Sequence, residues 1–261
     1  MTTLPSRMAG DRVMDQKVKG LSSALAIFLA AAAATASAQS FTWRVPNYGT
    51  EFSTAGIAPQ ALALDAGNDP YAFAFVANGA EFLIRVSHYD GADGSITWQR
   101  DVGLAASPWF PFSTYSSGQP TAALASVGTD AVLATTNYDT QFYGQIARYA
   151  GGDGGLVWEN AEHAQTAVAY EAVAVDAAGN VIAAGAAGDI YISPTKGHVA
   201  KFHASDGSLA WSVDLDAGAC GAGASFWFQF TTVSVDDNGD VVAGGFSPDE
   251  HAFPFCAFKL S

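Results

Sequence analysis

Short apolar runs alternate with polar turns along most of the chain. Val173–Val175 is an apolar, β-branched run that ends in a turn containing Gly179, and Val181–Ala184 follows it. Val199–Phe202 meets an Asp-Gly turn and leads into Leu209–Val213. Glycine beside Asn or Asp supplies the positive φ angles of tight hairpin turns. The pattern therefore predicts hairpins of short antiparallel strands.

Two hairpin elements alternate and recur along the sequence. The element with the Asp-Gly turn occurs without gaps at Tyr89–Trp98, Tyr149–Trp158 and Phe202–Trp211, each preceded by an aligned basic residue, His88, Arg148 and Lys201. The other element is clearest at Ala172–Gly185 and Thr232–Gly245, with weaker copies that begin at Ala61 and Ala122. One repeat is then four short strands over about 50–60 residues, which is typical of a propeller blade.

The repeats predict an all-β fold, a four-bladed β-propeller in which each blade is a four-stranded antiparallel sheet. Ala and Gly dominate the first two strands of a repeat, as expected for crowded inner strands. Trp98, Trp158 and Trp211 fall in the outermost strands. We expect these indoles to pack between adjacent blades, where each buries a large apolar area.

The two ends of the chain complement each other. The last repeat runs from Phe228 to Ser261 and contains only three strands. The segment Phe41–Val45 contains Trp43 and matches the outermost strand of a blade. The other three strands of such a blade do not precede it in the sequence. We expect the Trp43 strand to complete the last blade and to remove two open sheet edges. The alternatives are an eight-bladed propeller formed by a dimer that exchanges this strand, and a fragment of a longer propeller.

The repeat sequences resemble two related propeller families. Tyr89–Trp98 and its copies resemble the repeat of pyrroloquinoline-quinone-type, quinoprotein-like propellers, and Val173–Gly185 with His198–Phe202 is similar to the SBBP-type bacterial propeller repeat. Quinoprotein-like dehydrogenases have eight blades, adjacent cysteines and a calcium-and-quinone site. This chain has half the blades, and its cysteines are far apart. We therefore expect no quinone and no other cofactor, and we take the resemblance as specific for the fold alone.

The N-terminus has the pattern of a signal peptide. The basic residues Arg12, Lys17 and Lys19 precede an apolar run at Leu21–Ala34, and Ala36–Ala38 offers small residues for cleavage. We predict a signal peptide at residues 1–38, a propeller domain at residues 39–261 and a periplasmic or secreted location. An uncleaved membrane anchor is the alternative, although the run is short for a span.

The net charge excludes several classes of partner. The chain carries −14 at neutral pH, and residues 1–38 hold four basic and two acidic residues, so the mature chain would carry −16. A surface this acidic repels phosphate backbones and anionic lipids. We expect neither a nucleic acid nor, after signal cleavage, a membrane among its partners.

Aromatic loops supply the candidate binding surface. Loops rich in Trp, Phe and Tyr often mark interaction surfaces. The candidate ligand-binding residues are Trp109, Phe110, Tyr115, Tyr138, Phe142, Tyr143, Tyr191, Trp227 and Phe228. They would form a groove for a glycan, a peptide or another exported protein. The alternative is that the loops fold over the ring and bury their own aromatics as a plug.

No catalytic or metal-binding motif is recognisable. The histidines, His88, His163, His198, His203 and His251, lack ligand spacing and are expected at the surface or in turns. Glu81, Glu159 and Glu171 show no pattern of a catalytic pair, and Asp236–Asp240 is expected to be a solvated turn rather than a calcium loop. Two cysteines in an exported chain can pair, so we predict a disulfide between Cys220 and Cys256.

These features favour an exported, non-catalytic propeller that binds a ligand or protein, as a monomer or, alternatively, as a dimer. The runner-up is an extracytoplasmic enzyme that acts on a carbohydrate or another small substrate at the same face, for which two converging carboxylates would be the sign. A self-associating surface module is the third possibility.

Overall fold

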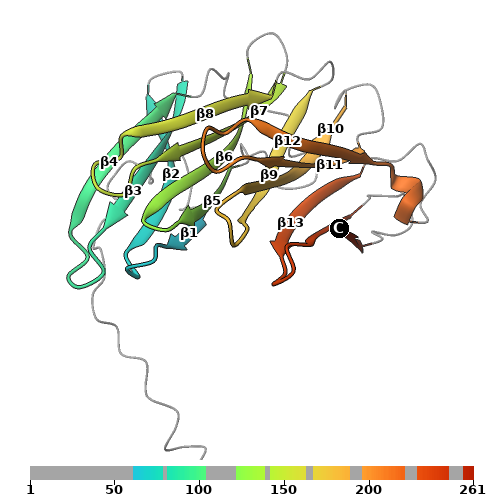
Figure 1. Ribbon diagram of the computed structural model, residues 1–261. Coiled ribbons are helices and arrows are strands. Elements are labelled where there is room, and N and C mark those ends of the chain that lie inside the picture. Colours follow the sequence, from blue (N-terminus) through green and yellow to red (C-terminus); the bar gives the residue numbers. More distant parts are fainter. Residues whose placement is uncertain are drawn as a thin grey trace, which may run out of the picture. The chain divides into compact units, whose positions relative to one another are not determined.

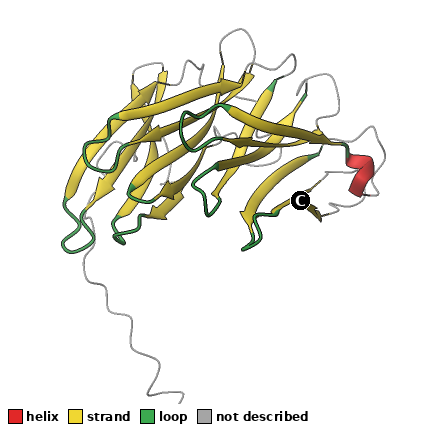
Figure 2. Cartoon of the chain, viewed as in Figure 1, coloured by secondary structure: helices red, strands yellow, loops and turns green. Residues whose placement is uncertain are grey.

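The computed structural model divides the chain into two units, Met1–Thr42 and Trp43–Ser261. It describes residues 61–78, 81–103, 122–138, 142–162, 167–188, 196–220, 228–246 and 255–261, all of which belong to the second unit. Within these residues, no helix has the length and apolar character needed to cross a membrane. Almost every regular element is a strand (Figure 2).

The first two sheets contain four strands each. The first consists of β1 (Ala61–Leu64), β2 (Pro70–Asn78), β3 (Glu81–Tyr89) and β4 (Ile96–Gly103). The second consists of β5 (Ala122–Val127), β6 (Asp130–Tyr138), β7 (Phe142–Tyr149) and β8 (Leu156–Glu162). In both sheets each strand pairs with the next one along the chain in an antiparallel register. These sheets therefore are meanders, as the repeated hairpins predict.

The third and fourth sheets continue this order. The third consists of β9 (Val168–Val175), β10 (Val181–Ala187), β11 (Lys196–Phe202) and β12 (Leu209–Leu215), and a short 3₁₀ helix (Ala217–Cys220) follows it. The fourth consists of β13 (Gln229–Val235), β14 (Val241–Phe246) and β15 (Phe255–Leu260). The four sheets are the blades of a β-propeller (Figure 1), which confirms the predicted fold class and the three strands predicted for the last repeat.

The first strand of each blade contacts the first strand of the next, so β1, β5, β9 and β13 lie side by side in this order. Small residues make this crowding possible, and all residues of the neighbouring strand β10 are buried. The Trp43 strand, and with it the predicted closure of the last blade, lies outside the described residues. β15 alternates between exposed and half-buried residues, whereas the equivalent strand β11 is buried at Gly197–Ala200.

Three hydrophobic cores lie between successive blades. The first joins blades one and two around Tyr71, Phe73 and Leu133, and the second joins blades two and three around Tyr170 and Phe202. The third joins blades three and four around Phe228, Phe230, Ile182 and Val199. Because each fully buried aromatic or aliphatic side chain stabilises the fold by about 1.5–3 kcal/mol, the contacts between blades carry much of the stability.

A tryptophan from the outermost strand of one blade seals the contact with the next. Trp98 and Trp158 are each 7% exposed, and their Nε1–H groups donate to the carbonyl oxygens of Gly151 and Ala204 in the following blade. Their rings lie on Gly154 and Gly207, which have φ angles of 68° and 69°. Glycine serves both needs there, since it adopts the left-handed conformation and leaves room for the indole.

Candidate functional site

An ion pair recurs at the turn between the first two strands of a blade. A carboxylate of that turn faces a basic residue of the third strand. The pairs are Arg148 with Asp130 at 2.8 Å, Lys201 with Asp176 at 2.8 Å, and Lys259 with Asp236 and Asp240 at 2.9 and 2.7 Å. The bases are the aligned positions of the repeat, so the pattern in the sequence has a direct structural counterpart.

These pairs fix the charge of the turn carboxylates. Burial opposes ionisation of Asp176, but hydrogen bonds from Lys201 and Asn180 outweigh it and lower its pKa to about 2. The hydrogen bond from Lys259 lowers the pKa of Asp236. Asp236 also accepts the backbone N–H groups of Asn238 and Asp240, which makes this segment a tight Asx turn.

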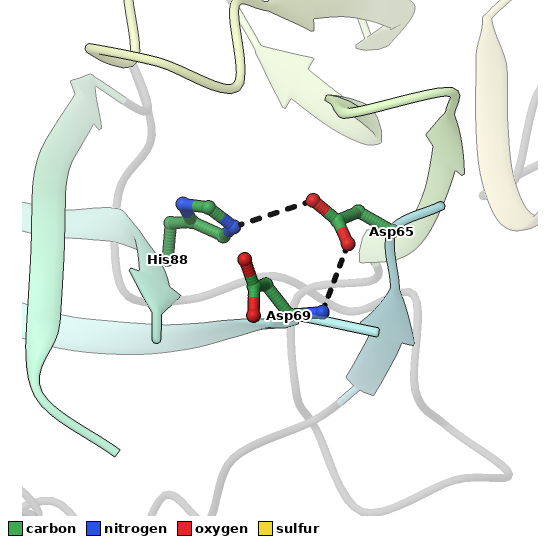
Figure 3. Close-up of side chains that lie close together, drawn as sticks. All are labelled: Asp65, Asp69 and His88. Carbon is green, nitrogen blue, oxygen red and sulfur yellow. Dashed lines mark hydrogen bonds and ion pairs between the residues drawn. The ribbon is translucent and has the colours of Figure 1, made fainter. Parts of the chain in front are cut away.

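Blade one carries a histidine in place of the lysine or arginine (Figure 3). Asp65 follows β1, Asp69 precedes β2, and His88 lies on β3. The Nε2 atom of His88 is 3.7 Å from Oδ2 of Asp65, and one ligand atom from each of the three residues lies within 4.8 Å of the other two. Asp65 and His88 are only 7% and 6% exposed, while Asp69 is half-buried.

Hydrogen bonds hold this cluster in place. One oxygen of Asp65 accepts the backbone N–H groups of Gly67 and Asp69 at 2.7 and 2.8 Å, and Asp69 accepts the N–H of Gly91 at 2.7 Å. The imidazole of His88 stacks on the ring of Tyr71 with 4.3 Å between centroids. The geometry brings two carboxylates and one imidazole together at the edge of the blade, a set of groups that can bind a cation.

A second buried histidine links blades two and three. His198 on β11 is 4% exposed, and its Nδ1 lies 2.7 Å from Oδ1 of Asp214 on β12. Its Nε2 lies 3.4 Å from Oε2 of Glu162 on β8, in the preceding blade. The hydroxyl of Tyr170 donates to the same oxygen of Glu162. The histidine therefore lies between two carboxylates from different blades.

This arrangement favours an ionised cluster. Burial lowers the pKa of His198, but the hydrogen bond with Asp214 and the nearby charge of Glu162 outweigh it and raise the pKa to about 9. Burial likewise opposes ionisation of Glu162, yet the nearby charge of His198 and the hydrogen bond from Tyr170 leave its pKa below the usual range. The hydrogen bond from His198 lowers the pKa of Asp214. The cluster thus acts as an ion pair that joins two blades.

Glu171 is a carboxylate on the innermost strand of blade three. It lies in a bulge of β9, because Tyr170 pairs with Gly185 and Ala172 pairs with Ala184. A Cβ at Gly185 would overlap the carbonyl oxygen of Ala169, so the bulge requires glycine there. Burial alone raises the pKa of Glu171 to about 7. In a catalytic carboxylate pair, repulsion from the second acid would raise the pKa further.

The predicted binding surface is only partly covered by the described residues. Trp109, Phe110, Tyr115, Tyr191 and Trp227 lie outside them. Tyr138 and Phe142 are backbone partners at the end of the β6–β7 hairpin, and the half-buried Tyr143 pairs with Asn137. Phe228 is fully buried and packs edge-on against Phe230 and Phe258. Phe228 is predicted to lie on the binding surface, but the structure places its side chain in the hydrophobic core.

The predicted placement of the histidines is corrected as well. His203 is exposed in a turn, but His88 and His198 are buried, and His163 and His251 lie outside the described residues. For His198, the nearby carboxylates of Asp214 and Glu162 offset the cost of removing an imidazolium from water. The alignment of His88 with Arg148 and Lys201 is the feature of the sequence that could have identified one of these partners.

Comparison with known proteins agrees with the repeat analysis. A family model of PQQ-type repeats, described as outer membrane protein assembly factor BamB, matches residues 74–212 and 143–245. The chain belongs to this family. No curated protein sequence matches it significantly. The matched residues contain the Asp-Gly turns of blades one, two and three.

Solved structures with similar folds are distant in sequence. BamB from Moraxella catarrhalis is 17% identical, with a TM-score of 0.41, over 76% of this chain and 51% of that one. Quinohemoprotein alcohol dehydrogenase ADHIIG from Pseudomonas putida HK5 is 12% identical, with a TM-score of 0.39, over 73% and 30%. A subtype N10 neuraminidase-like protein of A/little yellow-shouldered bat/Guatemala/060/2010 is 8% identical, with a TM-score of 0.46, over 78% and 58%. The chain spans about half the length of the first of these structures and less than two thirds of the length of each of the other two.

Proposed function

We propose that this member of the PQQ-type repeat family is a non-catalytic, protein-binding scaffold that works in the periplasm or outside the cell. The family model bears the description of an assembly factor, and the N-terminal pattern of the sequence is that of an exported protein. The net charge of −14 disfavours nucleic acid and anionic lipid as partners. A protein surface is the partner that best suits the remaining features.

Exposed apolar side chains at equivalent positions carry this proposal. Ile96, Leu156 and Leu209 each begin the outermost strand of a blade and are 49%, 47% and 45% exposed. They pair with Tyr89, Tyr149 and Phe202 in the same register. Among the described residues, β4, β8 and β12 are edge strands of their sheets, so these positions combine apolar contact area with backbone groups that no described strand pairs, as protein interfaces do.

Site-specific photo-crosslinking in intact cells tests the scaffold proposal. A photo-reactive residue at Leu156 or Leu209 should give the same discrete protein adduct, which mass spectrometry of the band identifies. The matched control is Asp237, an exposed residue in a turn of blade four. The proposal is contradicted if neither position gives a discrete adduct, or if Asp237 gives the same band.

A second candidate function, self-association, rests on the two end blades. Leu62 and Leu64 on β1 are 72% and 59% exposed, and Phe255 on β15 is 67% exposed. Ala63 packs toward blade two, and Cys256 and Phe258 pack toward blade three. Since side chains alternate along a strand, Leu62, Leu64 and Phe255 project from the outward faces of blades one and four. In a chain whose ring is open, such faces favour contact with another copy, whereas closure by the Trp43 strand would bury them between blades one and four.

Native mass spectrometry distinguishes this second candidate. Self-association predicts a dimer or larger species for the mature wild type, and predicts monomers for Leu62→Ser and Phe255→Ser. Leu156→Ser is the control, because it removes an exposed apolar side chain from an outer strand of blade two. A monomeric wild type at micromolar concentration would exclude self-association and leave the scaffold proposal unaffected.

A further inference from the structure

We propose that blade one binds a divalent transition-metal ion, Zn²⁺ in the first place, through Asp65, Asp69 and His88. The three residues come from the β1–β2 turn and from β3 (Figure 3). Their ligand atoms lie within 4.8 Å of one another. The proposal does not depend on the proposed protein-binding function.

The distance between the ligand atoms suits a bridging ion. Nε2 of His88 and Oδ2 of Asp65 are 3.7 Å apart, which is too long for a direct hydrogen bond. Zinc binds histidine nitrogen at about 2.0–2.1 Å and carboxylate oxygen at about 2.0–2.2 Å, so one ion reaches both atoms across a gap of this size. Asp69 is half-buried, which leaves the ion a path from solvent.

The imidazole of His88 has an unused nitrogen that points into the cluster. Among the described residues, its Nε2 is one of the few buried polar atoms without a hydrogen-bond partner, and the residue is only 6% exposed. The other nitrogen, Nδ1, lies 2.7 Å from Oγ1 of Thr97. When this hydroxyl donates its single hydrogen to the carbonyl oxygen of His88, 3.1 Å away, it accepts from Nδ1–H, which is one of the two tautomers compatible with the geometry. This tautomer leaves the Nε2 lone pair facing a carboxylate.

A lone pair beside a carboxylate is unfavourable unless a cation lies between them. Zinc-binding histidines are commonly oriented in this way, with the distal N–H donated to a fixed oxygen while the other nitrogen coordinates the metal. Thr97 supplies that oxygen here. The stack with Tyr71 holds the plane of the ring. The imidazole is thus oriented for coordination before an ion arrives.

In another copy of the repeat, a positive charge lies between the two turn carboxylates. In blade four the ammonium of Lys259 lies 2.9 Å from Asp236 and 2.7 Å from Asp240, and these aspartates occupy the positions of Asp65 and Asp69. The side chain of Lys259 thus brings a positive charge between two turn carboxylates. His88 occupies the position of Lys259 but is shorter. A metal ion would restore in blade one the charge that the ammonium supplies in blade four.

The ligand set indicates the kind of ion. One imidazole nitrogen with two carboxylates suits Zn²⁺ and related transition metals, whereas Ca²⁺ and Mg²⁺ prefer oxygen ligands throughout. Three protein ligands leave a fourth position open to water. Asp69 also accepts the N–H of Gly91, so a bound ion would tie the β1–β2 turn to the turn between β3 and β4.

Zinc titration of the mature protein tests the site. After dialysis against EDTA, ZnCl2 is added and binding is followed by calorimetry, by metal analysis of the gel-filtered protein and by the melting temperature. We expect one ion per chain and a melting temperature that rises with zinc concentration. His88→Lys is the matched variant, because it copies the arrangement of blade four. It should fold without zinc and show at least a tenfold loss of zinc affinity.

Asp69→Asn is the second variant, since an amide oxygen still accepts the N–H of Gly91. It should also bind zinc at least tenfold more weakly, with circular dichroism unchanged from the wild type. The proposal is overturned if the folded wild type binds no zinc, or if both variants retain its zinc affinity. In the latter case the ion binds elsewhere in the chain.

Discussion

The ring of Trp98 lies on Gly154 of the neighbouring blade, so closely that a Cβ at this glycine would be 2.6 Å from Cε3 of the indole. The same relationship joins Trp158 to Gly207. Each contact pairs a large apolar side chain of one blade with the Asp-Gly turn of the next. The Asp-Gly turn therefore has two roles. It connects the two strands of a hairpin, and it forms the surface on which the indole packs.

Gly154→Ala should destabilise the protein by about 2 kcal/mol or more, because the methyl group strains a positive φ and displaces the indole. Trp98→Ala should cost about 3–5 kcal/mol, the range for the loss of a large buried side chain. Urea unfolding measures both changes. Gly152→Ala is the control, since a Cβ there meets open space. Equal losses for Gly152→Ala and Gly154→Ala would contradict the packing role.

The same geometry sharpens the prediction for the N-terminal strand. Gly94 occupies the equivalent turn position of blade one and has a φ of 74°. We predict that Trp43 packs on Gly94 and completes the last blade. Trp43→Ala and Gly94→Ala should then be coupled in a double-mutant cycle of unfolding free energies. Additive losses would argue against this contact, and coupling that depends on protein concentration would indicate strand exchange between chains.

Stability should fall between about pH 6.5 and pH 9 because of His198. Its pKa rises from 6.5 to about 9 on folding, so the folded state holds a proton that the unfolded chain releases in this range. The slope for one proton is at most about 1.4 kcal/mol per pH unit. Urea unfolding across this range should show a flatter profile for His198→Gln. The exposed His203→Gln is the control, and an unchanged slope in His198→Gln would refute the assignment.

Glu171 should have its effect at lower pH. Its pKa rises from 4.5 to about 7 on folding, so its contribution to stability is present below pH 4.5 and is lost as the pH rises to about 7. Glu171→Gln should therefore be more stable than the wild type at pH 8, with the difference disappearing near pH 4.5. Glu159→Gln, at an exposed position of β8, should show no such difference. Thermal melts at both pH values provide the comparison.

The predicted disulfide has a chemical test. Cys220 ends the 3₁₀ helix, and Cys256 lies in β15 opposite Gly245. A pairing would hold the last strand of blade four and stabilise the protein by about 2–4 kcal/mol. Iodoacetamide should modify neither cysteine of the unfolded protein until a reductant is added, and Cys220→Ser should expose one reactive thiol. Modification without reductant would exclude the bond.

The repeats made the blades predictable, whereas the buried clusters depend partly on contacts that the repeats do not contain. The aligned bases Arg148, Lys201 and Lys259 belong to blades two to four, so their partners could be inferred from the turn that these copies share. Glu162, Tyr170 and His198 come from two blades, and the pairing of His198 with Asp214 has a counterpart in blade one, where Arg85 pairs with Asp101. Only the register of β11 with β12, in which Lys201 opposes Trp211 and His198 opposes Asp214, could have linked part of this cluster.

The contact between an indole and a glycine turn joins two different surfaces, one on each side of every blade. Such a contact is heterologous, so it can be repeated head to tail without limit. The number of blades is then set by the angle between neighbours rather than by the chemistry of the contact. Duplication or loss of a whole repeat would create no new kind of interface, which gives this architecture a route to propellers of different sizes.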